Sequence, residues 1–159
     1  MADGRTLLRW PIRVAVTAFQ RLRRAGWSFT RPVTHGVHAV PLTPEGEVVL
    51  VRLTYAAGWR LPGGGRKADE PPEEAVIREL REEIGLSAHG RIEHVCDFRH
   101  APDHRRGFGK LYVVRDVRYR PPRWSLEIEE VRAFQPGRMP PDMAAISRRQ
   151  LADAAAFLP

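Results

Sequence analysis

Apolar and polar positions alternate along the chain in segments that predict strands. The stretches 33–42 and 47–53 are short and rich in β-branched residues, and the turn-like "TPEG" separates them. They predict a β-hairpin. Further strands are predicted at 91–98, 109–119 and 129–135, with the polar loop 99–108 between the first two of these.

Helical spacing governs the segments around these strands. Between Pro71 and Ile84, the apolar residues form one stripe, made of Val76, Ile77, Leu80 and Ile84. Proline suits the first turn of a helix, and Gly85 suits its end. A final amphipathic helix is predicted within 140–158. Strands mixed with helices predict an α/β layered fold.

A helix is also predicted near the N-terminus, from Pro11 to about Arg24. Its apolar stripe consists of Ile12, Ala15, Ala18, Phe19 and Leu22. We expect this stripe to pack on the domain or on a partner subunit, which makes a homodimer one option. The same pattern also allows the helix to lie on an anionic membrane surface, the less favoured reading.

The charge of the chain is concentrated in that N-terminal region. The net charge is +7, and residues 1–32 hold seven arginines against Asp3 alone, which leaves about +1 for the rest. We therefore divide the chain into a basic helical arm at 1–32 and one domain at 33–159. Because the excess charge belongs to the arm, no specific nucleic-acid partner is expected.

The composition indicates an ordinary soluble protein. A length of 159 residues is typical of one domain with a proper core. No apolar run reaches the length of a membrane span, and arginines interrupt the N-terminus where a signal peptide would need an apolar core. The single cysteine, Cys96, fits a reducing compartment. We expect a cytoplasmic protein.

Like charges crowd one side of the helix at 71–84. Glu79, Glu82 and Glu83 stand at i, i+3 and i+4, and such pairs destabilise a helix by roughly 0.2–0.5 kcal/mol each. A solvated acidic face is the ordinary explanation of such a run. A divalent cation offers another, because Mg²⁺ prefers oxygen ligands from carboxylates, waters and phosphates. The preceding glycines Gly63–Gly65 allow backbone to approach a ligand closely.

These residues carry a resemblance to a known family. The segment from Gly64 to Leu86 resembles the Nudix box, G-x5-E-x7-R-E-U-x-E-E-x-G-U, in which U is a bulky aliphatic residue. Every fixed position is filled, by Gly64, Glu70, Arg78, Glu79, Leu80, Glu82, Glu83, Gly85 and Leu86. The resemblance implies an α/β/α sandwich with a mixed β-sheet, here preceded by the basic amphipathic arm. It also implies hydrolysis of a diphosphate linked to another group, with Mg²⁺ or Mn²⁺ as cofactor.

The resemblance also implies roles for individual residues. Glu82 and Glu83 would be the main metal ligands, with Glu79 a third ligand or the base that deprotonates water. In some members of the family the base lies on a distant loop instead. Arg78 would hold Glu79, and a backbone carbonyl of Gly63 or Gly64 could add a metal ligand. A further ligand is expected from a later loop, where the candidates are Glu127, Glu129 and Glu130.

The substrate is the least determined part of this interpretation. Arg52, Arg60 and Trp59 flank the expected phosphate site and are candidates for substrate binding; surface ion pairs and packing are the alternatives. A small-molecule substrate with a diphosphate linkage is expected, such as a nucleoside triphosphate or a nucleotide sugar. Two other functions stay open: a non-catalytic Nudix-fold binding domain, and a peripheral membrane protein that acts through its arm.

Overall fold

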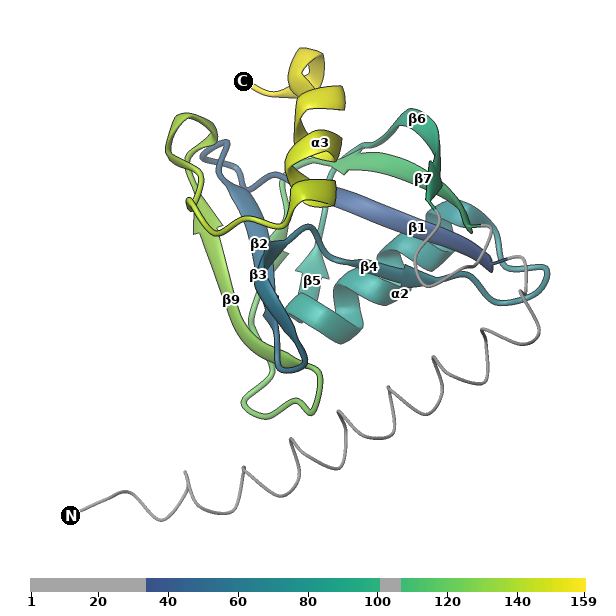
Figure 1. Ribbon diagram of the computed structural model, residues 1–159, viewed down its shortest axis with the longest axis horizontal. Helices are drawn as coiled ribbons and strands as arrows, with labels where there is room; N and C mark the ends of the chain where they lie inside the picture. The colour runs from purple at the N-terminus through teal and green to yellow at the C-terminus, as the bar shows by residue number, and fades with distance from the viewer. Residues whose placement is uncertain (1–33, 101–106) are drawn as a thin grey trace.

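The computed structural model describes residues 34–100 and 107–159 (Figure 1). The arm at 1–32, with its predicted helix and its membrane and dimer options, lies outside the described residues. The strands are β1 Thr34–Pro41, β2 Val48–Leu53, β3 Ala56–Arg60, β4 Gly63–Gly65, β5 Leu86–Ala88, β6 Ile92–His100, β7 Gly107–Val114, β8 Arg118–Tyr119 and β9 Ile128–Phe134. The helices are α2 Pro72–Ile84 and α3 Ala145–Asp153, with 3-10 turns η2 Pro136–Arg138 and η3 Ala155–Phe157.

The strands form one mixed sheet and two smaller antiparallel sheets. The mixed sheet has the order β4-β1-β7-β6, and β1 runs parallel to β7 while the other two pairings are antiparallel. A second sheet has the order β3-β2-β9, and β5 pairs with β8. In Figure 1, α2 lies below β1 and β4, and α3 lies above them.

Two hydrophobic cores explain this layering, because the central strands bury both of their faces. Alternate residues of β2 enter different cores: Val49 and Val51 pack with α2, whereas Val48 and Leu50 pack with the segment around α3. Alternate residues of β7 also enter different cores: Tyr112 and Val114 enter the first, and Leu111 and Val113 the second. The expected α/β/α arrangement around a mixed sheet is confirmed for the described residues.

The central helix has the predicted bounds, and its ends have local causes. Pro71 is the N-cap and Pro72 the first helical residue, where a missing amide hydrogen costs nothing. Gly85 ends the helix in the left-handed conformation, at φ 70°, and its N–H donates to the carbonyl of Leu80. A side chain at Gly85 is excluded, since its Cβ would lie 1.9 Å from the carbonyl oxygen of Arg120.

The predicted hairpin of 33–42 and 47–53 is wrong. The turn exists, with the Thr43 N–H donating to the Glu47 carbonyl and an isolated bridge between Leu42 and Val48. Beyond the turn, however, β1 pairs with β4 and β7, and β2 pairs with β3 and β9. The physical reason is that a strand inside a sheet needs hydrogen-bonding partners along both of its edges. For β1 and β2, these partners come from segments other than the one across the turn.

Three further segments differ from expectation. The single strand predicted at 109–119 is divided into β7, which ends at Val114, and the short β8. Gly63–Gly65, expected as a loop, forms the short strand β4 against β1. The C-terminal helix occupies only 145–153 of the predicted 140–158, since Pro140 and Pro141 precede it and the Asp142 carbonyl accepts the Trp59 N–H instead of a helical bond. Within 34–100 and 107–159, no helix combines the length and apolarity needed to span a membrane.

Candidate functional site

Arg78, on α2, joins the helix to the glycine segment that precedes it. Its Nε donates to Glu70 Oε1 at 2.7 Å, and its Nη2 donates to Glu70 Oε2 at 3.0 Å and to the Gly65 carbonyl at 2.9 Å. The Lys67 N–H also donates to Glu70, at 2.9 Å. The Arg78 ion pair, followed by this backbone bond, lowers the pKa of Glu70 to about 2. Glu70 is therefore a charged anchor at the start of the helix.

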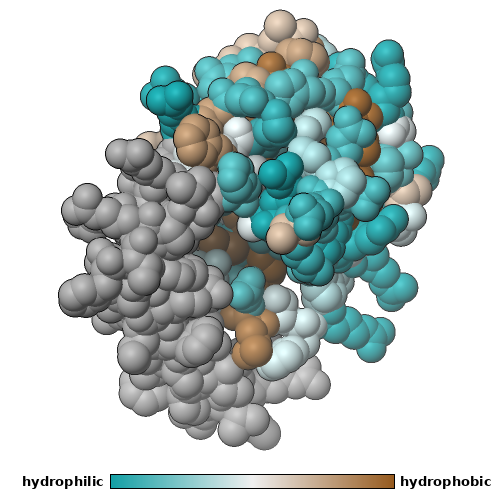
Figure 2. All heavy atoms as spheres, turned by 90° about the vertical axis from the view of Figure 1, so that its right-hand side faces the viewer, coloured by the Kyte–Doolittle hydropathy of each residue, from teal (hydrophilic) through white to brown (hydrophobic). Residues whose placement is uncertain are grey.

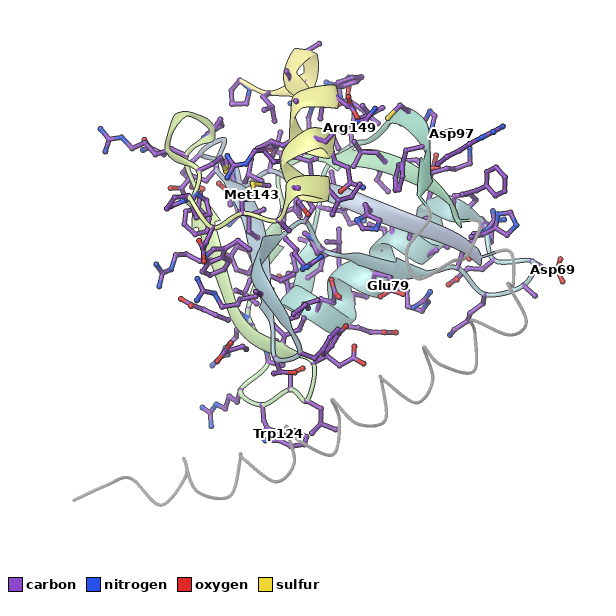
Figure 3. The ribbon with its side chains drawn as sticks, in the orientation of Figure 1. Asp69, Glu79, Asp97, Trp124, Met143 and Arg149 are labelled. Atoms are coloured by element: carbon purple, nitrogen blue, oxygen red, sulfur yellow. The ribbon has the colours of Figure 1, made fainter. Side chains whose placement is uncertain are left out.

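Glu79, labelled in Figure 3, contacts both this arginine and strand β4. Arg78 Nη1 donates to Glu79 Oε1 at 2.6 Å. The absence of a side chain at Gly64 creates the space, since a Cβ there would lie 2.5 Å from Glu79 Oε2. Burial raises the pKa of Glu79 despite the bond from Arg78, and the charges of Glu82 and Glu127 raise it further.

Glu83 is the most deeply placed carboxylate of the helix. The Gly63 N–H donates to Glu83 Oε2 at 2.9 Å, which fixes the carboxylate against β4. Burial raises the pKa of Glu83 to about 8, and the charges of Glu79, Glu127 and Glu82 act in the same direction. Without a counter-charge, this carboxyl therefore holds a proton at neutral pH.

Glu82 and Glu127 complete what we call the glutamate cluster: Glu79, Glu82, Glu83 and Glu127. The side chain of Glu82 is 59% exposed, with its Oε1 3.5 Å from Arg78 Nη1. Glu127 directly precedes β9, and its carbonyl accepts the N–H of Thr54 at 2.9 Å, which ties this loop to β2. Its charge contributes to the raised pKa of both Glu79 and Glu83.

The three loop candidates differ in part. Glu130 pairs with Arg132 on the same strand. Glu127 and Glu129 are both exposed, and the charge of Glu127 contributes to the raised pKa values of Glu79 and Glu83. The hydrogen bond from the Lys67 N–H to Glu70 was not predicted, because the amino-acid sequence does not indicate which backbone N–H will donate to a carboxylate.

The chemistry of the cluster fits a hard divalent cation. Two of the four carboxylates, Glu79 and Glu83, have raised pKa values, because burial and the charges of the other glutamates oppose their ionisation. Positive charge brought among them would reverse that opposition. Across the described parts of the chain, no three ligating side chains already converge at metal-binding spacing. The carbonyls of Gly63 and Gly64 stay predicted ligands.

The three predicted substrate-binding residues lie on β2 and β3, in other contacts. Arg52 pairs with Asp142 at 3.0 Å, and its guanidinium lies 4.7 Å from the centre of the Trp59 ring. Trp59 is 3% exposed and packs edge-on against Phe134, at 5.0 Å between ring centroids. Arg60 Nη2 donates to the Ala57 carbonyl at 3.5 Å. These contacts give Trp59 a place in the core, and substrate binding by the three residues stays a prediction.

Comparison with protein families gives one match over most of the chain. The family model described as "NUDIX domain" matches residues 33–154. Curated relatives match over shorter segments. The RNA pyrophosphohydrolase of Hahella chejuensis is 54% identical over 43 residues, 27% of each chain, and that of Gluconacetobacter diazotrophicus is 43% identical over 63 residues, 34% of this chain and 38% of the relative. The matched segments therefore span well under half of these relatives.

Solved structures match the whole domain. The MutT NUDIX hydrolase from Burkholderia pseudomallei superposes with a TM-score of 0.66 and 25% identity, covering 77% of this chain and 98% of that protein. The MutT protein from Methanosarcina mazei Go1, at 23% identity and a TM-score of 0.62, covers 80% of this chain and 96% of its own and shows the same fold. The family model, the fold and the completely filled box agree, and the chain belongs to the Nudix family.

Proposed function

We propose that this protein is a pyrophosphohydrolase that cleaves a diphosphate linkage in a nucleotide derivative, with Mg²⁺ or Mn²⁺ as cofactor. The observation that supports this most is the placement of Glu83, a half-buried carboxylate held by the Gly63 N–H among other glutamates. Such an arrangement destabilises the metal-free fold, because the ionised form is unfavourable there. A cation-binding role explains why the chain keeps it.

The residues divide into ligands and positioning groups. Glu82 and Glu83 would hold the cation, with Glu127 as the additional carboxylate from the loop before β9. A bound Mg²⁺ or Mn²⁺ supplies positive charge that offsets the charge on phosphate oxygens. The Gly63 N–H fixes the direction of the Glu83 carboxylate. Arg78 positions Glu79 and is itself anchored by Glu70.

Glu79 is the general base of this proposal. Burial raises its pKa above the ordinary value of a carboxyl group, which makes it a stronger base. The oxygen of a water molecule forms a bond to phosphorus, its proton passes to Glu79, and the anhydride P–O bond breaks to release a phosphate-bearing leaving group. Because Glu79 and Glu83 must both be ionised, turnover should rise with pH through the neutral range.

The choice of substrate rests on the relatives. The curated relatives are named RNA pyrophosphohydrolases, and in RNA the phosphoanhydride bonds are those of a 5′-triphosphate. This adds triphosphorylated RNA to the small molecules expected from the sequence. Nucleoside triphosphates, nucleotide sugars and 5′-triphosphorylated RNA therefore form the panel to be tested.

The test is hydrolysis of this panel with Mg²⁺, with Mn²⁺ and with chelator, as a function of pH. We expect metal-dependent release of phosphate or pyrophosphate from one class, with a higher rate at alkaline pH. Glu82→Gln should lower turnover by about 10²-fold or more. Glu74→Gln is the matched control, since Glu74 is an exposed glutamate on the same helix and should leave turnover unchanged.

The proposal fails if no member of the panel is cleaved with either metal by a folded protein. It also fails if Glu82→Gln and Glu74→Gln have equal turnover, because the cluster would then be only a solvated acidic face.

A further inference from the structure

The short connection between β3 and β4 carries the backbone N–H that holds Glu83. Leu61 and Pro62 lead from the end of β3 to Gly63, the first residue of β4, and the Gly63 N–H donates to Glu83 Oε2 at 2.9 Å. We call residues 61–63 the β3–β4 connection. The direction of the Gly63 N–H depends on the path of this connection, so contacts that fix the connection also fix the Glu83 carboxylate.

Strand β1 fixes the connection through backbone contacts. The Ala39 N–H donates to the Pro62 carbonyl at 3.0 Å, and Gly63 pairs with His38 in the β1–β4 register. A Cβ at Gly63 would lie 2.3 Å from the carbonyl oxygen of Val37, so the backbone there lies directly against β1. These contacts hold the end of the connection that enters β4.

A side chain of α3 holds the other end of the connection. Ser147 Oγ accepts the Leu61 N–H at 3.0 Å, and Ser147 and Leu61 are 1% and 3% exposed. The surface of the described domain is mostly hydrophilic in Figure 2, but this hydrogen bond lies beneath the surface. A buried backbone N–H needs a partner within the protein, and the Ser147 hydroxyl is that partner.

The segment that leads into α3 adds two bonds to the end of β3. The Trp59 N–H donates to the Asp142 carbonyl at 3.2 Å, and the Ala144 N–H donates to the Trp59 carbonyl at 2.8 Å. These two bonds are between backbone groups. The bond at Leu61 differs from them because its acceptor is a side chain, so a single substitution can remove it.

We propose that Ser147 is a positioning residue for the cation site, acting through Leu61 and Gly63 on Glu83. In Figure 1, α3 and α2 lie on opposite sides of β1 and β4, so the contacts from Ser147 to Glu83 link one helical layer to the other. Without the hydroxyl, the buried Leu61 N–H loses its partner, and the connection shifts to find another. The inference rests on the proposed function, which assigns the cation to Glu83.

Binding of Mn²⁺ to the full-length protein, measured by calorimetry without substrate, tests the inference. Ser147→Ala should raise the Kd for Mn²⁺ by about tenfold, the scale on which partners of metal ligands act. Ser147→Thr keeps the hydroxyl and should recover part of the lost affinity. Gln150→Ala is the matched control, since Gln150 is 2% exposed on the same helix and its amide has no hydrogen-bond partner among the described residues. It should bind Mn²⁺ like the wild type.

The metal dependence of turnover gives a second readout. Ser147→Ala should need about tenfold more Mg²⁺ for half-maximal turnover and should reach the wild-type rate at saturating Mg²⁺. A merely structural role would lower the amount of folded protein, and turnover would then fall by the same factor at every Mg²⁺ concentration.

The outcomes separate this inference from the proposed function. Wild-type Mn²⁺ affinity in Ser147→Ala overturns the inference alone, as does an equal loss in Ser147→Ala and Gln150→Ala, because the loss would then reflect packing of α3. Absence of Mn²⁺ binding by the wild type overturns the proposed function and the inference with it. Circular dichroism establishes that each variant is folded. If Ser147→Ala does not fold, Ser147→Cys, which has a similar shape and a weaker acceptor, takes its place.

Discussion

The two ends of the acidic helix use the same functional group in opposite ways. At the N-terminal end, Glu70 accepts two hydrogen bonds from Arg78 and one from the Lys67 N–H, and its pKa falls to about 2. Further along, Glu83 is half-buried near other charged glutamates, and loss of solvent raises its pKa to about 8. Both residues occupy fixed positions of one sequence pattern.

The difference distinguishes Glu70, a structural carboxylate, from Glu83, whose ionised form lacks a counter-charge. Glu70 is satisfied within the fold, because a guanidinium supplies its counter-charge. Among residues 34–100 and 107–159, Glu83 has one backbone N–H and several like charges around it, so its ionised form lacks a counter-charge there. A cation is therefore needed to explain the crowding of carboxylates only at the C-terminal end of α2, where Glu79, Glu82 and Glu83 lie.

The largest contrast should appear in turnover. Glu83→Gln removes a ligand of the proposed cation site while keeping the shape of the side chain, so turnover should fall by about 10²-fold or more. Steady-state kinetics on the substrate found in the panel, over a range of Mg²⁺ concentrations, measures this. Wild-type turnover at all metal concentrations would contradict the role given to Glu83.

Glu70→Gln should have a smaller effect of a different kind. It removes the anchor of Arg78, which in turn holds Glu79, so we expect activity to fall by about tenfold, as for other residues that act through a ligand or base. A second variant distinguishes a positioning role from a direct role in catalysis. Glu70→Asp keeps the negative charge and should recover part of the activity that Glu70→Gln loses. If Glu70→Gln costs as much as Glu83→Gln, the two ends of the helix do not differ in function.

The smallest effect concerns the stability of the metal-free protein. The change of stability with pH should have opposite signs for Glu83 and for Glu70. The pKa of Glu83 is raised, so its contribution to stability is full below about pH 4.5 and is lost as pH rises towards 8. Glu83→Gln mimics the protonated form and should melt about 4 °C above the wild type at pH 8 in chelator, with little difference at pH 5.

Glu70 should show the opposite slope. Its pKa is lowered, so its contribution is present above about pH 4.5 and disappears as pH falls towards 2. Glu70→Gln should therefore melt below the wild type at neutral pH. Thermal unfolding by circular dichroism from pH 3 to 8 measures both variants, and slopes of the same sign would remove the distinction between the two carboxylates.

The sequence alone determined the local features of this protein. The helix at 71–84, its proline start, its glycine end and the face that carries Glu79, Glu82 and Glu83 all follow from hydrogen bonds and contacts between residues close in the chain. The spacing of the box determined the family for the same reason, since its residues act together within one short segment.

Tertiary structure decided what depends on distant segments. The pattern of β1 marked a strand but could not name its partners, because β4 and β7 come from other parts of the chain. The core position of Trp59 was decided in the same way. Strand pairing and burial are long-range properties, whereas hydrophobic periodicity reports only which side of an element is covered.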